Sequence, residues 1–301
     1  MKVVGVGNAI VDVICKVSDD FLTNHALTKS TMKLLSEEEF KNLLSSVKIE
    51  TTISGGSVAN SIVGLSQLGN DVAFLGKVND DKLGEEYENS LKKEKVKFLY
   101  NKKKEFEPTG TCLILITPDS ERTMCTYLGC AGKINENDVK EEDIKASNIT
   151  FLEGYLWDKE EAKKAFLKAI SLSKISAMSL SDQFCVERHK LDFIDLIKNK
   201  VDIIFSNEQE IMSLFNTKTF EETIKICKQI KKNIIITRGE KGAVSVNSDN
   251  VAECKSEKNL KIRDLTGAGD LFAAGYLHGI INNFSIDDCL KKGTELSSKI
   301  I

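Results

Sequence analysis

One short run near the end of the chain, Gly267-Ala268-Gly269-Asp270, combines three small residues with a single carboxylate. Successive backbone N–H groups that no large side chain covers can bind an anion, and a helix that begins at Asp270 would add the partial positive charge of its N-terminus. A carboxylate at the same place can accept the proton of a hydroxyl group that attacks phosphorus. We therefore interpret the run as a phosphoryl-transfer site. The alternative is a tight turn with Asp270 as an ordinary helix N-cap.

A second glycine pair, Gly55-Gly56, precedes an apolar pattern of helical spacing at residues 57–68. Backbone without side chains allows a ligand to approach closely, and Asn60 lies one turn into the expected helix. The pair is therefore a candidate binding loop. The alternative is a plain loop followed by Ser57 as the N-cap of the helix.

A third group of polar residues follows the expected strand at 201–206. Asn207 and Glu210 are three residues apart and share one face of a helix. An amide and a carboxylate at the carboxyl end of a strand can hold Mg²⁺ through water. A capping box, with Asn207 as N-cap and Glu210 three residues later, is the equally good alternative.

Two familiar nucleotide-binding patterns are missing from the sequence. The P-loop pattern G-x-x-x-x-G-K-[ST] does not occur, and GVGNAI at residues 5–10 has only the first two glycines of G-x-G-x-x-G. A dinucleotide-binding oxidoreductase is therefore a weak alternative, which binding of NADH would favour.

The elements that must position these residues alternate along most of the chain. Short β-branched runs such as KVVGVG at 2–7 and NIIIT at 233–237 are separated by helical patterns of ten to fifteen residues. This alternation predicts βαβ units and a mostly parallel sheet. GAVSV and NVAEC, which follow NIIIT, are predicted to form a hairpin.

Two stretches break the alternation and predict a small accessory sheet that acts as a lid. Residues 9–50 contain a strand pattern without a crossover helix, and residues 96–130 contain two strand patterns joined by the turn TPDSER. We expect these two stretches to form a discontinuous lid. The core domain is then expected to comprise residues 1–8, 51–95 and 131–301.

The composition of the chain limits which partners it can bind and where in the cell it is expected. The formal net charge of the 301-residue chain is −3, so nothing attracts it generally to nucleic acid or to an anionic membrane. Its eight cysteines include no C-x-x-C pair and lie mostly in apolar runs, as in a reduced, cytoplasmic protein. No stretch approaches the roughly 18 apolar residues of a membrane span. We expect a cytoplasmic protein with small-molecule partners, either a monomer or a homodimer.

Taken in order, five motifs resemble the ribokinase-like (PfkB-type) family of sugar and nucleoside kinases. They are GNAIVD (7–12), GGSVAN (55–60), NEQE (207–210), TRGEKGA (237–243) and DLTGAGD (264–270). The resemblance covers essentially the whole chain, and the last motif is the most specific of the five. It implies an α/β fold: a three-layer, doubly wound, mostly parallel sheet with a small β-sheet lid.

Within that family the chain is most similar to the bacterial adenosine-kinase-like branch, in the segments at 108–132, 152–158 and 181–189. The resemblance implies transfer of a phosphoryl group from ATP to a primary hydroxyl of a nucleoside, adenosine, or of a sugar. Mg²⁺ is the implied cofactor, and a monovalent cation such as K⁺ is a further candidate. A sugar kinase for ribose, fructose or ketodeoxygluconate is one alternative, and a non-catalytic sensor of nucleosides or sugars is another.

The resemblance also implies roles for individual residues. Asp270 is implied as the general base, the amides of Gly267, Ala268 and Gly269 as the anion hole, and Arg122 as a lid residue that neutralises phosphate charge. The implied substrate-binding residues are Asn8, Asp12, Gly55, Gly56, Asn60, Cys112, Leu128 and Tyr155.

For the nucleotide, the resemblance implies an ATP site and a metal site. The implied ATP-binding residues are Asn207, Thr237, Gly239, Gly242, Thr266, Gly267 and Gly269. Asn207 and Glu210 are the implied Mg²⁺ residues. Tyr155 and Trp157 are two positions apart and would share one face of a strand beside the base, with a core position as the alternative for both residues.

Overall fold

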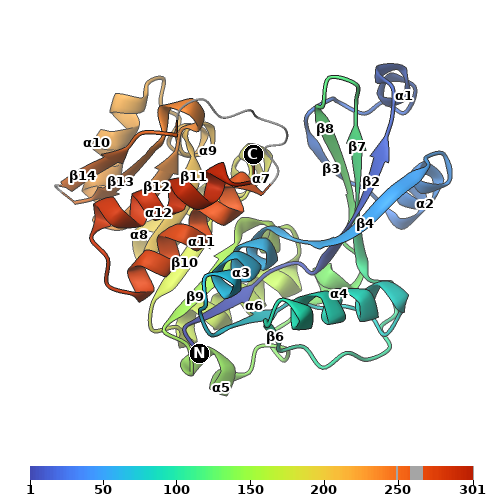
Figure 1. The fold of residues 1–301 in the computed structure, drawn as a ribbon, viewed down its shortest axis with the longest axis horizontal. Helices are drawn as coiled ribbons and strands as arrows, with labels where there is room; N and C mark the ends of the chain where they lie inside the picture. Colours follow the sequence, from blue (N-terminus) through green and yellow to red (C-terminus); the bar gives the residue numbers. More distant parts are fainter. Residues whose placement is uncertain (249, 258–266, 301) are drawn as a thin grey trace.

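The structure, a computed structural model, describes residues 1–248, 250–257 and 267–300 (Figure 1). Within these residues the larger of two sheets has nine strands in the order β14-β13-β12-β11-β10-β9-β1-β5-β6. The strands from β6 to β12 are parallel, and β13 and β14 form the predicted antiparallel hairpin at one edge. The strands are β1 (Val3–Val6), β5 (Val72–Leu75), β6 (Lys97–Phe98), β9 (Ile149–Glu153), β10 (Ser176–Ser179), β11 (Ile203–Asn207), β12 (Asn233–Thr237), β13 (Ala243–Asn247) and β14 (Asn250–Cys254).

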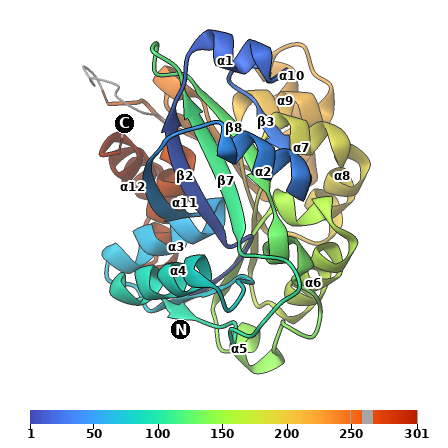
Figure 2. The ribbon, with the colours of Figure 1, turned by 90° about the vertical axis from the view of Figure 1, so that its right-hand side faces the viewer.

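Helices cover both faces of this sheet, which gives three layers (Figure 2). One face carries α3 (Ser57–Gln67), α4 (Lys82–Lys93), α11 (Ala268–Ile281) and α12 (Ile286–Ser298). The other carries α5 (Glu141–Lys145), α6 (Glu160–Leu172), α7 (Gln183–Arg188), α8 (Lys190–Asn199), α9 (Glu208–Phe215) and α10 (Phe220–Ile230). Every residue of β1 and β9 is buried, as expected for strands covered on both faces. The predicted α/β class is confirmed.

A smaller sheet of five strands, in the order β3-β8-β7-β2-β4, projects from the core (Figure 1). Its strands are β2 (Ile10–Lys16), β3 (Met32–Leu34), β4 (Ile49–Gly55), β7 (Gly110–Ile116) and β8 (Arg122–Tyr127). The short helices α1 (Asp19–Asn24) and α2 (Glu37–Ser45) cover one face and bury its apolar residues, among them Leu113 and Leu115. Alternate residues of β7, Cys112 and Ile114, form a second apolar cluster on the opposite face.

The two sheets place two segments differently from the sequence-based boundaries. Residues 51–55, assigned to the core, belong to β4 of the small sheet, which pairs with β2 as far as Gly55. Residues 97–98, assigned to the lid, form β6 at the edge of the large sheet. Neither strand carries a clear apolar alternation, since β4 is largely exposed and β6 is only two residues long.

The close packing of α11 against α12 depends on Gly275. A Cβ atom on Gly275 would stand 2.4 Å from the backbone oxygen of Lys292 and 2.8 Å from Cα of Gly293. Backbone atoms cannot turn aside as a side chain can. We therefore expect Gly275→Ala to lower the free energy of unfolding by about 1–3 kcal/mol, measured by urea denaturation.

Gly269→Ala is the matched control for this prediction. Gly269 also lies in α11, and apart from its chain neighbours and the helix backbone no heavy atom of the described residues stands within 4 Å of its would-be Cβ. Its free energy of unfolding should stay within about 1 kcal/mol of the wild-type value or rise slightly. Equal stabilities of the two variants would contradict the proposed role of Gly275 in helix packing.

Candidate active site

The carboxyl ends of β1, β9 and β10 open into a cavity of about 300 Å³ beneath the small sheet. From β1 the sheet order runs outward through β5 and β6 on one side and through β9 to β12 on the other. Open α/β sheets bind ligands where the order reverses in this way, at the carboxyl ends of the strands. The cavity is therefore the candidate active site.

Asp270 lies in the first turn of α11, at the cavity, and its side chain is hydrogen-bonded to the neighbouring helix α3. Its Oδ1 atom accepts a hydrogen bond from Oγ of Ser57 at 2.7 Å, and Oδ2 accepts one from Nδ2 of Asn60 at 2.9 Å. Oγ of Ser61 donates to the backbone oxygen of Asp270 at 2.9 Å. These contacts fix the start of α11 against α3 and point the carboxylate at the cavity, which Gly267 also lines.

The local alternatives for these residues are wrong. Helix α11 begins at Ala268, two residues before the predicted start, and its N-cap is Gly267 with φ +75°, a left-handed conformation that favours glycine. Asp270 is therefore inside the helix and bonds to another element. The N-cap of α3 is Gly56 rather than Ser57, which leaves the Ser57 hydroxyl to bind Asp270.

Burial raises the pKa of Asp270 to about 6, against the opposing effect of the hydrogen bonds from Ser57 and Asn60. The desolvated carboxylate is a stronger base than one in water, yet it is still largely ionised at pH 7. A group in this range suits general base catalysis.

The first backbone N–H groups of α11 lie beside this carboxylate. The N–H groups of the first turn have no acceptor within their own helix and carry the positive end of its dipole. Gly267, Ala268 and Gly269 supply such groups, and no other element among the described residues comes within 4 Å of a Cβ placed on Gly269. The arrangement can hold an anion next to Asp270. Thr266, the preceding candidate, lies outside the described residues.

Asp12 reaches the same cavity from β2 of the small sheet. Its partner on β4 is Ile53, and a Cβ atom on the nearby Gly55 would stand 2.2 Å from Oδ2 of Asp12. Burial and the charge of Asp270 raise the pKa of Asp12 to about 7, and the guanidinium of Arg122 opposes this rise. The lining therefore includes two neighbouring carboxyl groups, Asp12 from the small sheet and Asp270 from helix α11.

Glu153 also lines the cavity, was not predicted from the sequence, and links Asn8, which follows β1, to the start of α3. It ends β9, and its Oε1 atom accepts the backbone N–H of Asn8 at 2.8 Å. Its Oε2 atom accepts the backbone N–H of Val58, in the first turn of α3, at 3.1 Å. Burial raises its pKa to about 7. The sequence signal that could have identified Glu153 is an acidic residue at the carboxyl end of a strand that is otherwise apolar.

Apolar side chains of the small sheet form the wall facing these polar groups. Cys112 and Leu128, two of the candidate substrate-binding residues, line the cavity together with Ile10, Ile114 and Met124. They belong to the apolar cluster on the face of the small sheet that α1 and α2 do not cover.

Tyr155 lines the cavity, whereas Trp157 does not. The two residues lie in a 3₁₀ turn, η2 (Gly154–Asp158), so the prediction that they share a strand face is wrong. The Tyr155 hydroxyl donates to Oδ2 of Asp182 at 2.7 Å. Trp157 packs edge-on against Phe166 in the core, which confirms the alternative for this residue.

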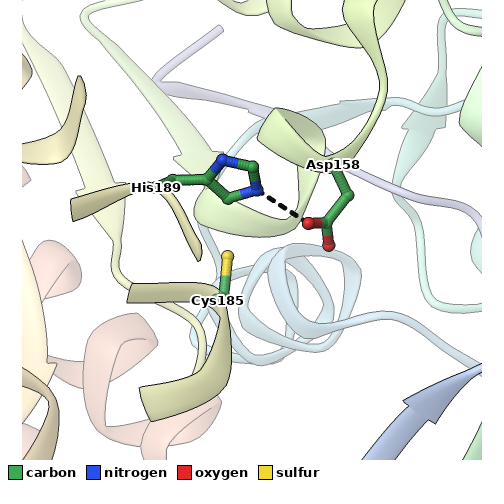
Figure 3. Close-up of side chains that lie close together, drawn as sticks. All are labelled: Asp158, Cys185 and His189. Atoms are coloured by element: carbon green, nitrogen blue, oxygen red, sulfur yellow. Dashed lines mark hydrogen bonds and ion pairs between the residues drawn. The ribbon is translucent and has the colours of Figure 1, made fainter. Parts of the chain in front are cut away.

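Asp158, the last residue of η2, also lines the cavity and was not predicted. Figure 3 shows its carboxylate pointing toward His189, with Cys185 beside them. Nε2 of His189 lies 2.7 Å from Oδ1, and Arg188 donates through Nε and Nη2 to both carboxylate oxygens at 2.9 and 2.8 Å.

Arg122 lies on the other side of Asp12. It lines a second cavity of about 420 Å³, between the small sheet and helices α3, α4 and α11. This cavity also contacts Asp12, Asn60 and Gly267, so the two cavities share part of the polar lining. The structure thus brings Arg122 near the predicted phosphate position without placing it in the first cavity.

The remaining candidates lie farther along the sheet edge. Asn207 and Thr237 are paired neighbours at the carboxyl ends of β11 and β12. Asn207 and Glu210 form the complete capping box that the sequence analysis gave as an alternative, with the Glu210 N–H 2.8 Å from Oδ1 of Asn207. Gly239 and Gly242 lie in and after the turn η3 (Gly239–Lys241), between β12 and β13. These residues do not line the first cavity.

The capping box bears on how a divalent cation could bind here. Glu210 is buried, and both of its carboxylate oxygens accept hydrogen bonds from Asn207, at 2.6 and 3.0 Å. Direct ligation would break the cap, whereas contact through water would leave it intact. The donor set therefore fits water-mediated binding of Mg²⁺.

Ribokinase-like kinases have this architecture. It combines a doubly wound sheet, a small second sheet, and an aspartate at their junction beside the free backbone amides at the start of a helix. The sequence profile described as pfkB family carbohydrate kinase matches residues 24–301. The chain belongs to this family.

Relatives in the family include nucleoside kinases and sugar kinases. Adenosine kinase from Sinorhizobium meliloti is 34% identical, with a TM-score of 0.94 over 98% of this chain and 92% of its own. A probable sugar kinase from Rhizobium etli is 36% identical, with a TM-score of 0.95 over 99% and 92%. The 5-dehydro-2-deoxygluconokinase of Clostridium perfringens is 27% identical over 82% of this chain and 78% of its own.

The protein is therefore an ATP-using phosphotransferase with an alcohol group as acceptor, a kinase of nucleosides or sugars. The expectations of family and enzyme class are confirmed. No helix among the described residues is both long and apolar enough to span a membrane.

Proposed function

We propose that the protein phosphorylates the primary hydroxyl of a nucleoside, with adenosine as the favoured substrate and Asp270 as the general base. The observation that carries the proposal is the position of Asp270 on the cavity, tied to Ser57 and Asn60 beside the first amides of α11. The neighbouring apolar wall suits a flat base.

The chemistry is an in-line displacement at phosphorus. The acceptor hydroxyl oxygen forms a bond to the γ-phosphorus of ATP, the bond from that phosphorus to the bridging oxygen breaks, and ADP leaves. Asp270 takes the hydroxyl proton, while the amides of Gly267, Ala268 and Gly269 stabilise the charge on the transferred oxygens. Asn207 and Glu210 would hold Mg²⁺ through water, and the ion would supply positive charge to the phosphates of ATP. K⁺ is a further candidate.

The small sheet would act as a lid over this site. Asp12 on β2, with Asn8, Gly56 and Asn60 around it, would bind the ribose hydroxyls. Arg122 on β8 would approach the phosphates as the sheet closes, and closure would exclude the water that otherwise hydrolyses ATP. Thr237, Gly239 and Gly242 would form part of the ATP groove. We propose that the protein acts in the cytoplasm as a monomer or a homodimer.

Charge favours a nucleoside over a sugar acid such as the one named for the Clostridium relative. Four carboxyl groups line the cavity, those of Asp12, Glu153, Asp158 and Asp270, and no lysine or arginine is among its described lining residues. Arg188 compensates the charge of Asp158, so a substrate carboxylate would be repelled mainly by the ionised Asp270. A small neutral sugar would leave the apolar wall of Ile10, Cys112 and Leu128 without a partner.

An ATP-coupled assay tests this proposal. We expect ADP release with adenosine at a kcat/KM well above the values for ribose, fructose and a ketodeoxy sugar acid. Turnover of a free sugar with none of adenosine would overturn the nucleoside assignment and leave the kinase assignment intact.

The pH dependence of turnover should report the ionisation of Asp270. The base acts in its charged form, so kcat/KM should fall as the pH drops through about 6, where the carboxylate takes up a proton. The Ser57 hydrogen bond lowers this pKa. We therefore expect Ser57→Ala to move the acid limb of the profile to higher pH.

Profiles of wild-type and Ser57→Ala enzyme measured from pH 5 to 8 make the comparison. The ionisation of ATP is the same in both series, so a difference in pH between the acid limbs of the two profiles is caused by the protein. A lower plateau with an unshifted limb would contradict the assignment of Asp270 as the titrating base.

A further inference from the structure

We propose that Asp158 is a specificity-determining residue that accepts a hydrogen bond from the exocyclic amino group of the nucleobase. The proposal rests on the proposed nucleoside kinase function and names the class of base: a purine with an amino group over one without it.

The first argument is the place of Asp158 on the cavity. It lines the same space as Asp270 and the apolar wall, and it lies three residues after Tyr155 in the turn η2. The polar end, with Asp12 and Asp270, suits the ribose and the phosphoryl group. A base in the slot between Tyr155 and the small sheet would then bring its edge toward Asp158.

The second argument is the way the carboxylate is held. The side chain of Asp158 is only 6% exposed. Arg188, the last residue of α7, and His189, which follows it, both contact the carboxylate. A carboxylate only accepts hydrogen bonds, so Nε2 of His189 carries a proton. Arg188 and His189 compensate the burial of the carboxylate charge and fix its direction.

The third argument is the acceptor capacity that remains. An ionised carboxylate has about four acceptor positions. The described contacts use three, two from Arg188 and one from His189, and leave one on Oδ2. A buried acceptor left without a donor costs free energy, so a ligand that brings a donor to this position gains affinity, and an exocyclic amino group is such a donor.

A metal site is the competing use of this cluster, since Asp158, Cys185 and His189 offer ligand atoms within 4.8 Å of one another. The guanidinium of Arg188 already holds both carboxylate oxygens. Burial also raises the pKa of the Cys185 thiol, so the thiolate that a metal needs is disfavoured. The contacts favour an oriented acceptor over a metal ligand.

The test compares adenosine with purine riboside, which has hydrogen in place of the amino group. For the wild-type enzyme we expect kcat/KM to be roughly 10- to 100-fold higher for adenosine, as for loss of a hydrogen bond to a charged group. In Asp158→Asn this preference should fall to about threefold or less, because Arg188 and His189 would claim the amide oxygen and leave its NH₂ toward the substrate. If the substitution merely damaged the structure, the kcat/KM values for adenosine and for purine riboside would instead fall by the same factor.

Asp192→Asn is the matched control. Asp192 accepts from Trp157 and Lys163 near the cluster but does not line the cavity, so the preference should persist. Should Asp158→Asn fail to fold, Asp158→Glu keeps the charge and moves the acceptor by one methylene, and it should also weaken the preference.

Equal kcat/KM values for the two nucleosides in the wild-type enzyme would overturn the role of Asp158 while the nucleoside kinase function stands. A preference unchanged in Asp158→Asn would overturn it too. Turnover of ribose or fructose with neither nucleoside phosphorylated would overturn the proposed function itself.

Discussion

Asp270→Asn should lower kcat by about 10²–10⁴, the usual loss on removal of a general base. Asparagine has nearly the same shape and keeps an oxygen that can accept from Ser57 or Asn60, but it cannot take up the hydroxyl proton. Binding of ATP and the thermal midpoint should change little. Steady-state kinetics, ATP titration and thermal unfolding measure the three quantities.

The comparison with Ser57→Ala separates catalysis from packing. Ser57→Ala removes one of the two side-chain hydrogen bonds to Asp270 but keeps the base, so its kcat at pH 8 should stay far above that of Asp270→Asn. If Asp270→Asn retained a kcat near the wild-type value, Asp270 could not be the base.

Gly55→Ala should raise the KM for the acceptor and reduce kcat/KM by about 10²-fold, the order expected for a misplaced substrate group. The new Cβ atom would stand 2.2 Å from Oδ2 of Asp12, so the carboxylate must move. The KM for ATP should be much less affected. Kinetics with each substrate varied in turn give the two values.

A double-mutant cycle tests whether Gly55 acts through Asp12. If it does, Gly55→Ala should cost little in a protein that already carries Asp12→Ala, and the two losses should be strongly non-additive. Full additivity of the two changes would show that the alanine disturbs the site by another route.

The main features of the fold could be predicted because local patterns determine them. The buried strands β1, β9 and β12 are short apolar runs, and the helices between them have clear spacing, so the parallel sheet follows. The small sheet was harder to delimit. Strand β4 is largely exposed, so no apolar alternation marks its end at Gly55.

The anion-binding run could also be predicted, since its chemistry is carried by residues adjacent in sequence. The hydrogen bond from Ser57 to Asp270 could not, because it joins residues 213 positions apart. The roles of Glu153 and Asp158 depend in the same way on partners brought together by the fold. Tyr155 and Trp157 were placed on a strand because nothing local marks the 3₁₀ turn that follows β9.

The most direct test of the central claim is to follow the phosphorus in the reaction by ³¹P NMR. With ATP and adenosine the protein should produce ADP and a nucleoside 5′-monophosphate in equal amounts, and with 5′-deoxyadenosine, which lacks the primary hydroxyl, it should produce neither. Formation of ADP and free phosphate without a phosphorylated nucleoside would contradict the account of Asp270 as the base that activates that hydroxyl.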